Sequence, residues 1–173
     1  MNQLFTITET SRNMVSKILE NHSLEQLNKI PEGFSNNLIW NIAHIVVTQQ
    51  LLVYKLSGLP TMVSDEIIEK YKKGTKPEQD ASQAEVDEIK SLLFITIKKT
   101  KEDYDNGIFK NYNEYPTSTG FILNNVEDAM AFNNFHEGLH IGILMSLRKF
   151  VLTNYTNNKN PNASTIFSIG IFF

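Results

Sequence analysis

The chain has 173 residues, of which 41% are hydrophobic and 20% charged, a balance typical of one globular domain and not of a disordered segment. It contains no cysteine, which excludes thiolate zinc sites, cysteine nucleophiles and iron–sulfur clusters and is compatible with a reducing compartment. The formal net charge is −3 and the only arginines are Arg12 and Arg148, so we expect no nucleic-acid partner.

The sequence also lacks the patterns of export and membrane insertion. Residues 1–6 have neither the basic start nor the apolar run of a signal peptide. No apolar run approaches the ~20 residues that a membrane-spanning helix needs. The strongest candidate, residues 38–47, contains Asn41 and His44. We therefore expect a cytoplasmic protein with no membrane partner.

The first predicted helix covers residues 7–21. A capping box of Thr6 and Glu9 would start it. Its expected core face follows helical steps of three and four residues: Leu4, Ile7, Ser11, Met14 and Ile18.

A second helix is predicted over residues 37–56, capped by Ser35 or Asn36. Gly58 and Pro60 are expected to end it. The long connection that follows, to about residue 81, is expected to hold a short helix at residues 65–71. The expected core face of the second helix is Trp40, His44, Val47, Leu51 and Tyr54.

The third helix is predicted over residues 83–104, capped by Ser82 with Glu85. After a connection with turn residues at 106–107 and 115–116, a fourth helix is predicted over residues 126–153, capped by Asn124 with Glu127. The expected inward positions of the fourth helix are Ala129, Phe132, Asn133, His136, His140, Ile143 and Leu147.

Four amphipathic helices of about twenty residues predict an all-α protein, a four-helix bundle with long connections, over residues 1–153. Residues 154–173 form a C-terminal tail that is first polar and then strongly apolar, ending Ile-Phe-Ser-Ile-Gly-Ile-Phe-Phe. The apolar part is too short to span a bilayer and would be a docked strand or a dimer contact. An exposed apolar segment promotes association, so a homodimer is predicted.

The histidines are the most informative residues. His136 and His140 are four residues apart on a helix, which puts their rings ~40° apart on one face, where they can chelate one metal ion. The segment His136-Glu137-Gly138-Leu139-His140 also satisfies the His-Glu-x-x-His pattern of zinc proteases. Such proteases mostly take a third ligand from downstream, and no His, Asp or Glu follows His140. A protease is therefore disfavoured.

A third ligand must come from upstream, and His44 on the second helix is the best candidate. Three neutral imidazoles with an open position are typical of a catalytic site and not of a structural one. The alternatives are a hydrogen-bonded core histidine at position 44 and a chance pair on the fourth helix. The joint placement of three of the four histidines on inward faces favours the metal site, because buried imidazoles need polar partners.

Several neighbours are candidates for supporting roles. Asn41, Thr48 and Asn133 lie one helical turn from a histidine and could hold an imidazole or a metal-bound water, or could be ordinary buried polar groups. Glu137 lies at the edge of the histidine face. It is the candidate catalytic residue, a general base on a metal-bound water, with a solvated helix carboxylate as the alternative.

Three segments resemble the DinB/YfiT-like superfamily, and the resemblance covers most of residues 1–153. They are Asn-Leu-Ile-Trp-Asn-Ile-Ala-His at 37–44 with Thr-Gln-Gln-Leu-Leu at 48–52 and Ser-Gly-Leu-Pro at 57–60; Tyr-Pro-Thr at 115–117 with Gly120; and Phe-His-Glu-Gly-Leu-His-Ile-Gly at 135–142. Family members are four-helix bundles in which three histidines hold a metal, often nickel or zinc. The resemblance implies His44, His136 and His140 as the ligands.

The resemblance also implies a range of reactions. Some relatives are thiol S-transferases that use bacillithiol or mycothiol, others are labelled metal-dependent hydrolases, and many have no assigned substrate. We therefore expect an enzyme with a zinc or nickel ion that acts on a small molecule, with thiol transfer favoured over hydrolysis and a low-molecular-weight thiol as a possible partner. A homodimer is implied here too. The alternative is a non-catalytic helical module that binds a metal, a ligand or a partner.

Overall fold

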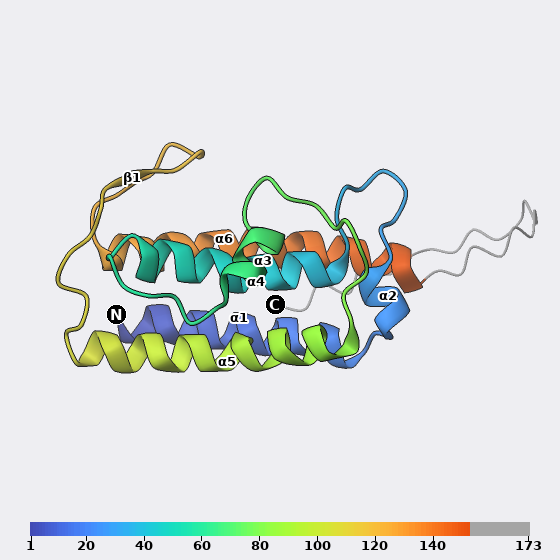
Figure 1. Ribbon diagram of the computed structural model, residues 1–173, viewed down its shortest axis with the longest axis horizontal. Helices are drawn as coiled ribbons and strands as arrows, with labels where there is room; N and C mark the ends of the chain where they lie inside the picture. Colours follow the sequence, from blue (N-terminus) through green and yellow to red (C-terminus); the bar gives the residue numbers. More distant parts are fainter. Residues whose placement is uncertain (153–173) are drawn as a thin grey trace, which may run out of the picture.

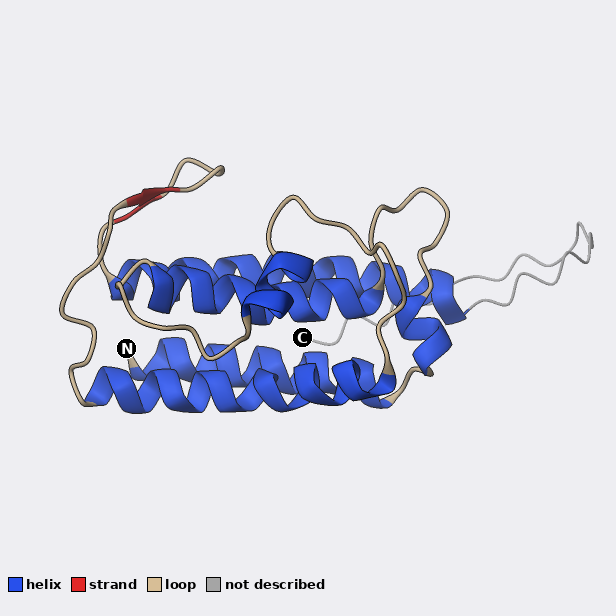
Figure 2. Ribbon diagram, viewed as in Figure 1, coloured by secondary structure: helices blue, strands red, loops and turns tan. Residues whose placement is uncertain are grey.

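The structure, a computed structural model, describes residues 1–152 and is almost entirely helical (Figures 1 and 2). The prediction of an all-α fold is confirmed. The C-terminal tail, and with it the predicted division into domain and tail, lies outside the described residues. Among residues 1–152 no helix has both the length and the apolar composition needed to cross a membrane. The elements are α1 (Asn2–Glu20), α2 (Leu24–Asn28), α3 (Leu38–Gln50), the π-helical turn η1 (Leu51–Lys55), α4 (Asp65–Tyr71), α5 (Gln83–Asp105), β1 (Tyr115–Pro116), β2 (Ile122–Leu123) and α6 (Val126–Leu152).

The four long helices lie side by side, and each packs on two others. α1 and α3 both contact α5 and α6. Figure 1 shows that α1 and α6 run in one direction and α3 and α5 in the other. The pairs α1–α6 and α3–α5 are therefore parallel neighbours. A tight turn can join only antiparallel helices, which explains why a long connection carrying α4 separates α3 from α5.

α3 is the most buried of these helices. Thr48 is its one residue that is not fully buried, as expected for a helix that is apolar on nearly all sides. Its N-terminus is capped by Asn37, whose side chain accepts a hydrogen bond from the backbone N–H of Trp40. Gly58 ends the segment with a φ of 72°, a left-handed conformation that glycine adopts without a steric penalty.

The predicted core face of α1 is wrong: the buried face is shifted by about one residue along the sequence from the predicted one. Ile7 and Met14, expected inside, are 50% and 46% exposed. The predicted capping box is wrong as well, because the helix already begins at Asn2 and the Thr6 hydroxyl donates to the Asn2 carbonyl. The observed buried face mixes apolar and polar side chains: Phe5, Thr8, Arg12, Val15, Ser16, Ile18 and Leu19.

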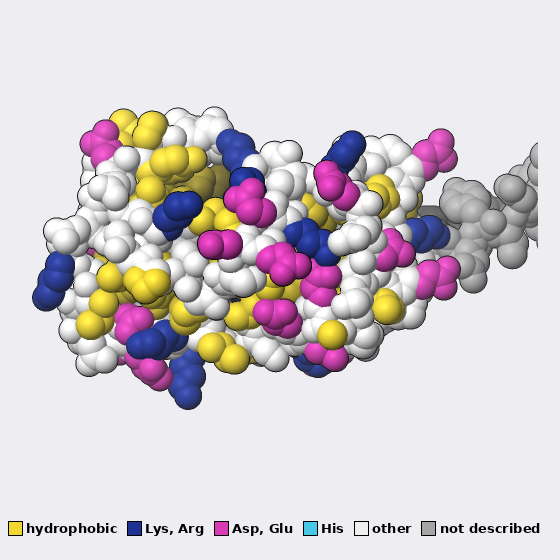
Figure 3. All heavy atoms as spheres, viewed as in Figure 1, with side chains coloured by type: hydrophobic (Ala, Val, Ile, Leu, Met, Phe, Trp, Pro, Cys, Tyr) yellow, Lys and Arg dark blue, Asp and Glu magenta, His cyan; other side chains and the backbone are white. Residues whose placement is uncertain are grey.

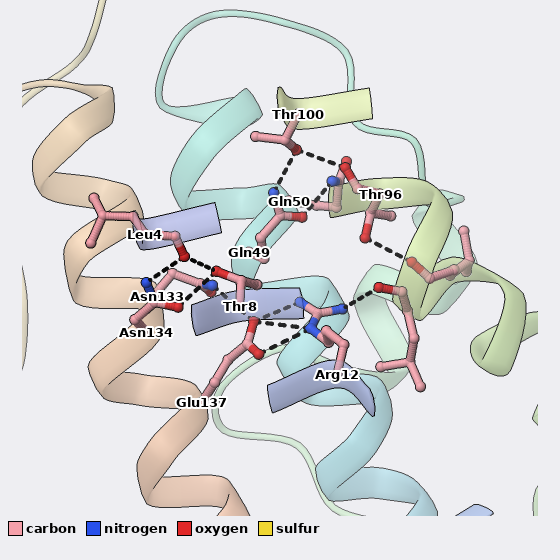
Figure 4. Close-up of polar contacts among 12 residues, drawn as sticks. Leu4, Thr8, Arg12, Gln49, Gln50, Thr96, Thr100, Asn133, Asn134 and Glu137 are labelled. Carbon is pink, nitrogen blue, oxygen red and sulfur yellow. Dashed lines mark hydrogen bonds and ion pairs between the residues drawn. The ribbon is translucent and has the colours of Figure 1, made fainter. Parts of the chain in front are cut away.

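A buried ion pair explains that error. The Arg12 guanidinium donates to both carboxylate oxygens of Glu137 at 2.7–3.0 Å, and both side chains are 0% exposed (Figure 4). Arg12 also donates to the Leu93 carbonyl at 3.4 Å, and the Asn133 amide donates to Glu137 at 2.8 Å. A buried charge with a full set of hydrogen-bond partners is tolerated in a protein core. A charged residue therefore occupies a position that periodicity alone assigns to solvent.

Smaller departures from the predictions lie in the connections. The short helix α2 was not predicted, although Ser23 and Gln26 form a complete capping box at its start. The hairpin of β1 and β2 was not predicted either. α6 has Asn125 rather than Asn124 accepting the hydrogen bond from the N–H of Asp128.

Replacing Glu137 by Gln is expected to destabilise the protein by about 3–5 kcal/mol, because the buried guanidinium of Arg12 then has no carboxylate partner. Urea unfolding followed by circular dichroism measures this loss. The double variant Arg12→Leu/Glu137→Leu should cost less than Glu137→Gln, since it buries no charge at all. The exposed pair Lys101–Asp105 is the control, and Asp105→Asn should cost about 1 kcal/mol or less. A loss for Glu137→Gln as small as that of Asp105→Asn would contradict the prediction.

Candidate metal centre

Three histidines from two helices meet in one place. His44 on α3 and His136 and His140 on α6 each offer a ring nitrogen within 4.8 Å of those of the other two. The three ring centroids are 4.5–5.2 Å apart. Ligand nitrogens around a tetrahedral zinc, each ~2.0–2.1 Å from the ion, are separated by distances within this limit. The cluster that the sequence predicts is therefore present, and its geometry is compatible with one divalent ion.

Hydrogen bonds fix the orientation of two of the rings. The Nδ1 of His44 lies 2.6 Å from the backbone carbonyl oxygen of Tyr71, so it carries the proton and donates. The Nδ1 of His140 lies 2.9 Å from the side-chain oxygen of Asn41, whose own amide nitrogen donates to the Asn37 carbonyl. Both rings therefore keep the lone pair on Nε2, the atom that remains for a metal. Of the two roles considered for Asn41, the structure shows the supporting one, and the histidine that it holds is His140 rather than the neighbouring His44.

The environment of His44 adds two further contacts. Trp40 stacks on the imidazole with a centroid distance of 4.7 Å and an interplanar angle of 10°. The Thr48 hydroxyl lies 3.3 Å from His44 Nε2. The stacked indole restricts the tilt of the ring, and the hydroxyl lies on the side where the three ligand atoms converge.

His136 shows a polar atom without a partner. Its Nδ1 is buried and makes no hydrogen bond within residues 1–152. Leaving a buried polar nitrogen unsatisfied costs about 1–3 kcal/mol, and a partner on that nitrogen removes the cost. This orphaned nitrogen, together with the two oriented rings, fits the donor set of a three-histidine metal centre.

All three imidazoles are held in the neutral form. Burial lowers the pKa of His136 to about 3, with the nearby His140, His44 and Arg12 acting in the same direction. Burial, followed by the proximity of His44, lowers the pKa of His140 to about 4. Burial also lowers the pKa of His44, against a smaller opposite effect of its hydrogen bond to Tyr71. Neutral imidazole is the form that coordinates metals, so the site is ready for an ion at neutral pH.

The histidines line one side of a cavity of about 530 Å³. η1 and α6 contribute most of its apolar lining, and residues 115–119 of the hairpin segment cover another side. Lys55 and Lys73 also line it; neither was singled out from the sequence. Lys55 could have been found, because His44, Thr48, Leu51 and Lys55 follow helical steps of four and three. The lining is His44, Thr48, Leu51, Leu52, Lys55, Leu56, Lys73, Tyr115, Thr117, Ser118, Thr119, Phe132, Phe135, His136, Leu139 and His140.

A π-helical turn lies directly beside this cavity. η1 continues α3 from Leu51 to Lys55, and three of its five residues, Leu51, Leu52 and Lys55, line the cavity. A π-helical turn widens the helix and changes the directions of the side chains that follow it, and such turns are frequent at functional sites. Here it presents two adjacent leucines to the cavity.

The structure places Glu137 away from the cavity. Its carboxylate faces α1 and is held by Arg12 and Asn133, so the interpretation as a solvated helix carboxylate is wrong. The placement does not support the general-base role either, because both oxygens already accept hydrogen bonds from Arg12 and Glu137 does not line the cavity. Asn133, a candidate either for holding a histidine or for an ordinary buried amide, donates to Glu137. Ile143, expected inside, is 40% exposed, and Leu144 is buried in its place.

The fold and the histidine cluster define a class of helical proteins with a potential three-histidine metal centre. Residues 7–144 match the model of the DinB superfamily, and the chain belongs to that superfamily. The matched range contains most of α1, the three clustered histidines, Arg12 and Glu137. A sequence search among curated proteins gives no match.

Replacing Asn41 by Leu is expected to weaken zinc or nickel binding about 10–100-fold, because His140 loses the acceptor that orients its ring. Competition with a chromophoric chelator measures the affinity. Asn134→Leu is the control, since Asn134 bonds to α1 and not to a histidine. Equal affinities in the two variants would contradict the role assigned to Asn41.

The metal-free protein is expected to lose stability as the pH falls below about 6.5. The unfolded chain takes up protons on its histidines near that pH, whereas the pKa values of His136 and His140 in the folded protein lie near 3 and 4. The loss approaches about 1.4 kcal/mol per pH unit for each neutral buried histidine. It should extend from about pH 6.5 down toward the folded pKa values. Urea unfolding of chelator-treated protein across this range measures the slope. His136→Gln should reduce it and His22→Gln should not.

Proposed function

We propose that the protein is a metal-dependent enzyme acting on a small molecule, with His44, His136 and His140 holding one divalent ion. Zinc and nickel both suit three imidazole ligands. One observation supports the proposal above the others: the three histidines line a cavity, and residues 1–152 supply no fourth protein ligand that would close the site. A three-ligand site with an open side is typical of catalytic centres.

The ion, when bound, would supply a positive charge that favours the deprotonated form of a water or thiol beside it. The chain's own groups bind and shield the reactants. The leucines and phenylalanines of the lining exclude water, which strengthens electrostatic interactions inside the cavity. The Thr48 hydroxyl, 3.3 Å from His44 Nε2, can donate to or accept from a reactant placed at the histidines.

Thiol transfer is the reaction that we favour over hydrolysis. Among residues 1–152 no Asp or Glu lines the cavity, and Glu137 is engaged with Arg12. Hydrolysis of an amide or ester benefits from a protein group that accepts a proton from water and donates it to the leaving group. A thiol whose ionisation is favoured by the ion's charge loses its proton to solvent, and its sulfur then forms a C–S bond while the electrophile's bond to its leaving group, such as chloride, breaks. This substitution needs no protein group to donate a proton to the leaving group. We therefore propose a low-molecular-weight thiol such as bacillithiol or mycothiol as cosubstrate, and hydrolysis of a small molecule as the second candidate.

The remaining sequence predictions stay proposals. A cytoplasmic location would supply reduced low-molecular-weight thiols. A homodimer was predicted partly from the apolar segment beyond residue 165, which lies outside the described residues.

The metal-loaded protein is expected to conjugate a thiol to an electrophile such as chlorodinitrobenzene, with a gain in absorbance that depends on bound metal. The metal content by elemental analysis should be near one ion per chain and should be lost in His44→Ala together with the activity. His22→Ala is the matched control and should keep both. Hydrolysis of a panel of esters and amides by the same preparation tests the second candidate.

The results also separate the enzyme from a non-catalytic module. Bound metal without conjugation across several thiols would remove thiol transfer. Bound metal with neither reaction would favour a metal-binding module, and no bound metal would contradict the proposed centre itself.

A further inference from the structure

The charged side chains of residues 1–152 that line the cavity are all positive. Lys55 and Lys73 line the cavity, and no carboxylate of the described part of the chain does. Neither lysine has an ion-pair partner within residues 1–152, whereas Lys70, Lys99 and Lys101 are each paired with a carboxylate. Since the three histidines are neutral, the lysines alone give the cavity a charge of about +2 at neutral pH. A divalent ion on neutral ligands would add to it.

The remaining lining is mainly apolar. Figure 3 shows a recess with a hydrophobic floor and with basic and acidic side chains beside its mouth. A cavity of about 530 Å³ with such walls has the size and character of a small-molecule site. The apolar side chains that line it are Leu51, Leu52, Leu56, Phe132, Phe135 and Leu139.

The histidines and the lysines lie at different depths of the cavity. His44 is 5% exposed and lies at the buried end, whereas Lys55 and Lys73 are exposed. His44 and Lys55 are eleven residues apart along α3 and η1, which corresponds to roughly 15 Å along the helix axis. The leucines at positions 51 and 52 lie between them in sequence. A ligand that satisfies both ends therefore has an anionic group at the mouth and an apolar body beneath it.

We infer that the cavity binds a small amphipathic organic anion, whose carboxylate or phosphate-like group lies at Lys55 and Lys73 and whose apolar body lies against the leucines and phenylalanines. That the reaction takes place at the buried end of the cavity, beside the histidines, rests on the proposed function. The anion preference itself rests on the two unpaired lysines and the absence of a carboxylate from the lining.

Calorimetric titration of chelator-treated protein with phenylhexanoate and with the neutral phenylhexanamide tests this. Metal-free protein is used because a carboxylate also binds a metal ion directly. We expect the anion to bind about tenfold more tightly than the amide. The advantage should shrink with added salt. The variant Lys55→Gln/Lys73→Gln should lose this advantage and bind the amide as before.

The matched control is Lys29→Gln/Lys98→Gln, which removes the same charge outside the cavity and should keep the preference. Equal binding of anion and amide by the unmodified protein would overturn the inference, as would an undiminished preference in Lys55→Gln/Lys73→Gln. A phosphonate analogue of the same length, compared with the carboxylate, shows which anionic group the lysines favour.

Zinc titrations of the same proteins keep this inference separate from the proposed function. A lysine-dependent anion preference in a protein that binds no zinc would sustain the anion site and contradict the metal centre. Zinc binding near one ion per chain with no anion preference would sustain the metal centre and contradict the anion site.

Discussion

The buried ion pair between Arg12 and Glu137 determines how α6 is turned within the bundle. Glu137 lies next to His136 and three residues before His140, and each residue of a helix is rotated about 100° from the last. Holding Glu137 against α1 therefore turns both histidines to the same side of it, about 100° and 60° away, toward α3. The contact between the imidazoles of α6 and His44 follows from that rotation. A carboxylate that does not touch the cavity thus controls the geometry of the site, in keeping with the general importance of supporting residues around metal ligands.

A second constraint comes from the polar groups of the core. Gln49 donates to Thr100, Gln50 donates to Gln49, and Tyr54 donates to Asp103, all between or within helices at buried positions. Buried polar groups are stable only when they are paired, and most mispaired arrangements leave at least one of them unsatisfied. The core therefore selects one register of α3 against α5 as well as one rotation of α6. Both are required for a site whose ligands come from two different helices.

The sequence was sufficient for the class of fold and the histidine cluster, because both depend on local periodicity. Four amphipathic stretches gave the long helices, and the four-residue spacing of His136 and His140 placed them on one face. The failures share a different cause. Arg12 and Glu137 are separated by 125 residues, so neither shows locally that it will have a partner of opposite charge. Periodicity left Arg12 off the expected core face of the first helix and placed Glu137 at the edge of the histidine face. Lys73 lies in a connection with no repeating pattern, so its approach to the cavity depends on the path of the chain after α4.

The parallel pairing of α1 with α6 joins the two ends of the matched domain. During synthesis on the ribosome, α1 emerges first and must wait for α6 before Arg12 finds its carboxylate, and the three ligands are complete only when α6 is present. In a fragment that stops before α6, Arg12 would have no carboxylate of Glu137 to pair with, and only His44 of the three clustered histidines would be present. The arrangement of three imidazoles that could hold a metal ion is therefore complete only when the whole helical assembly has formed.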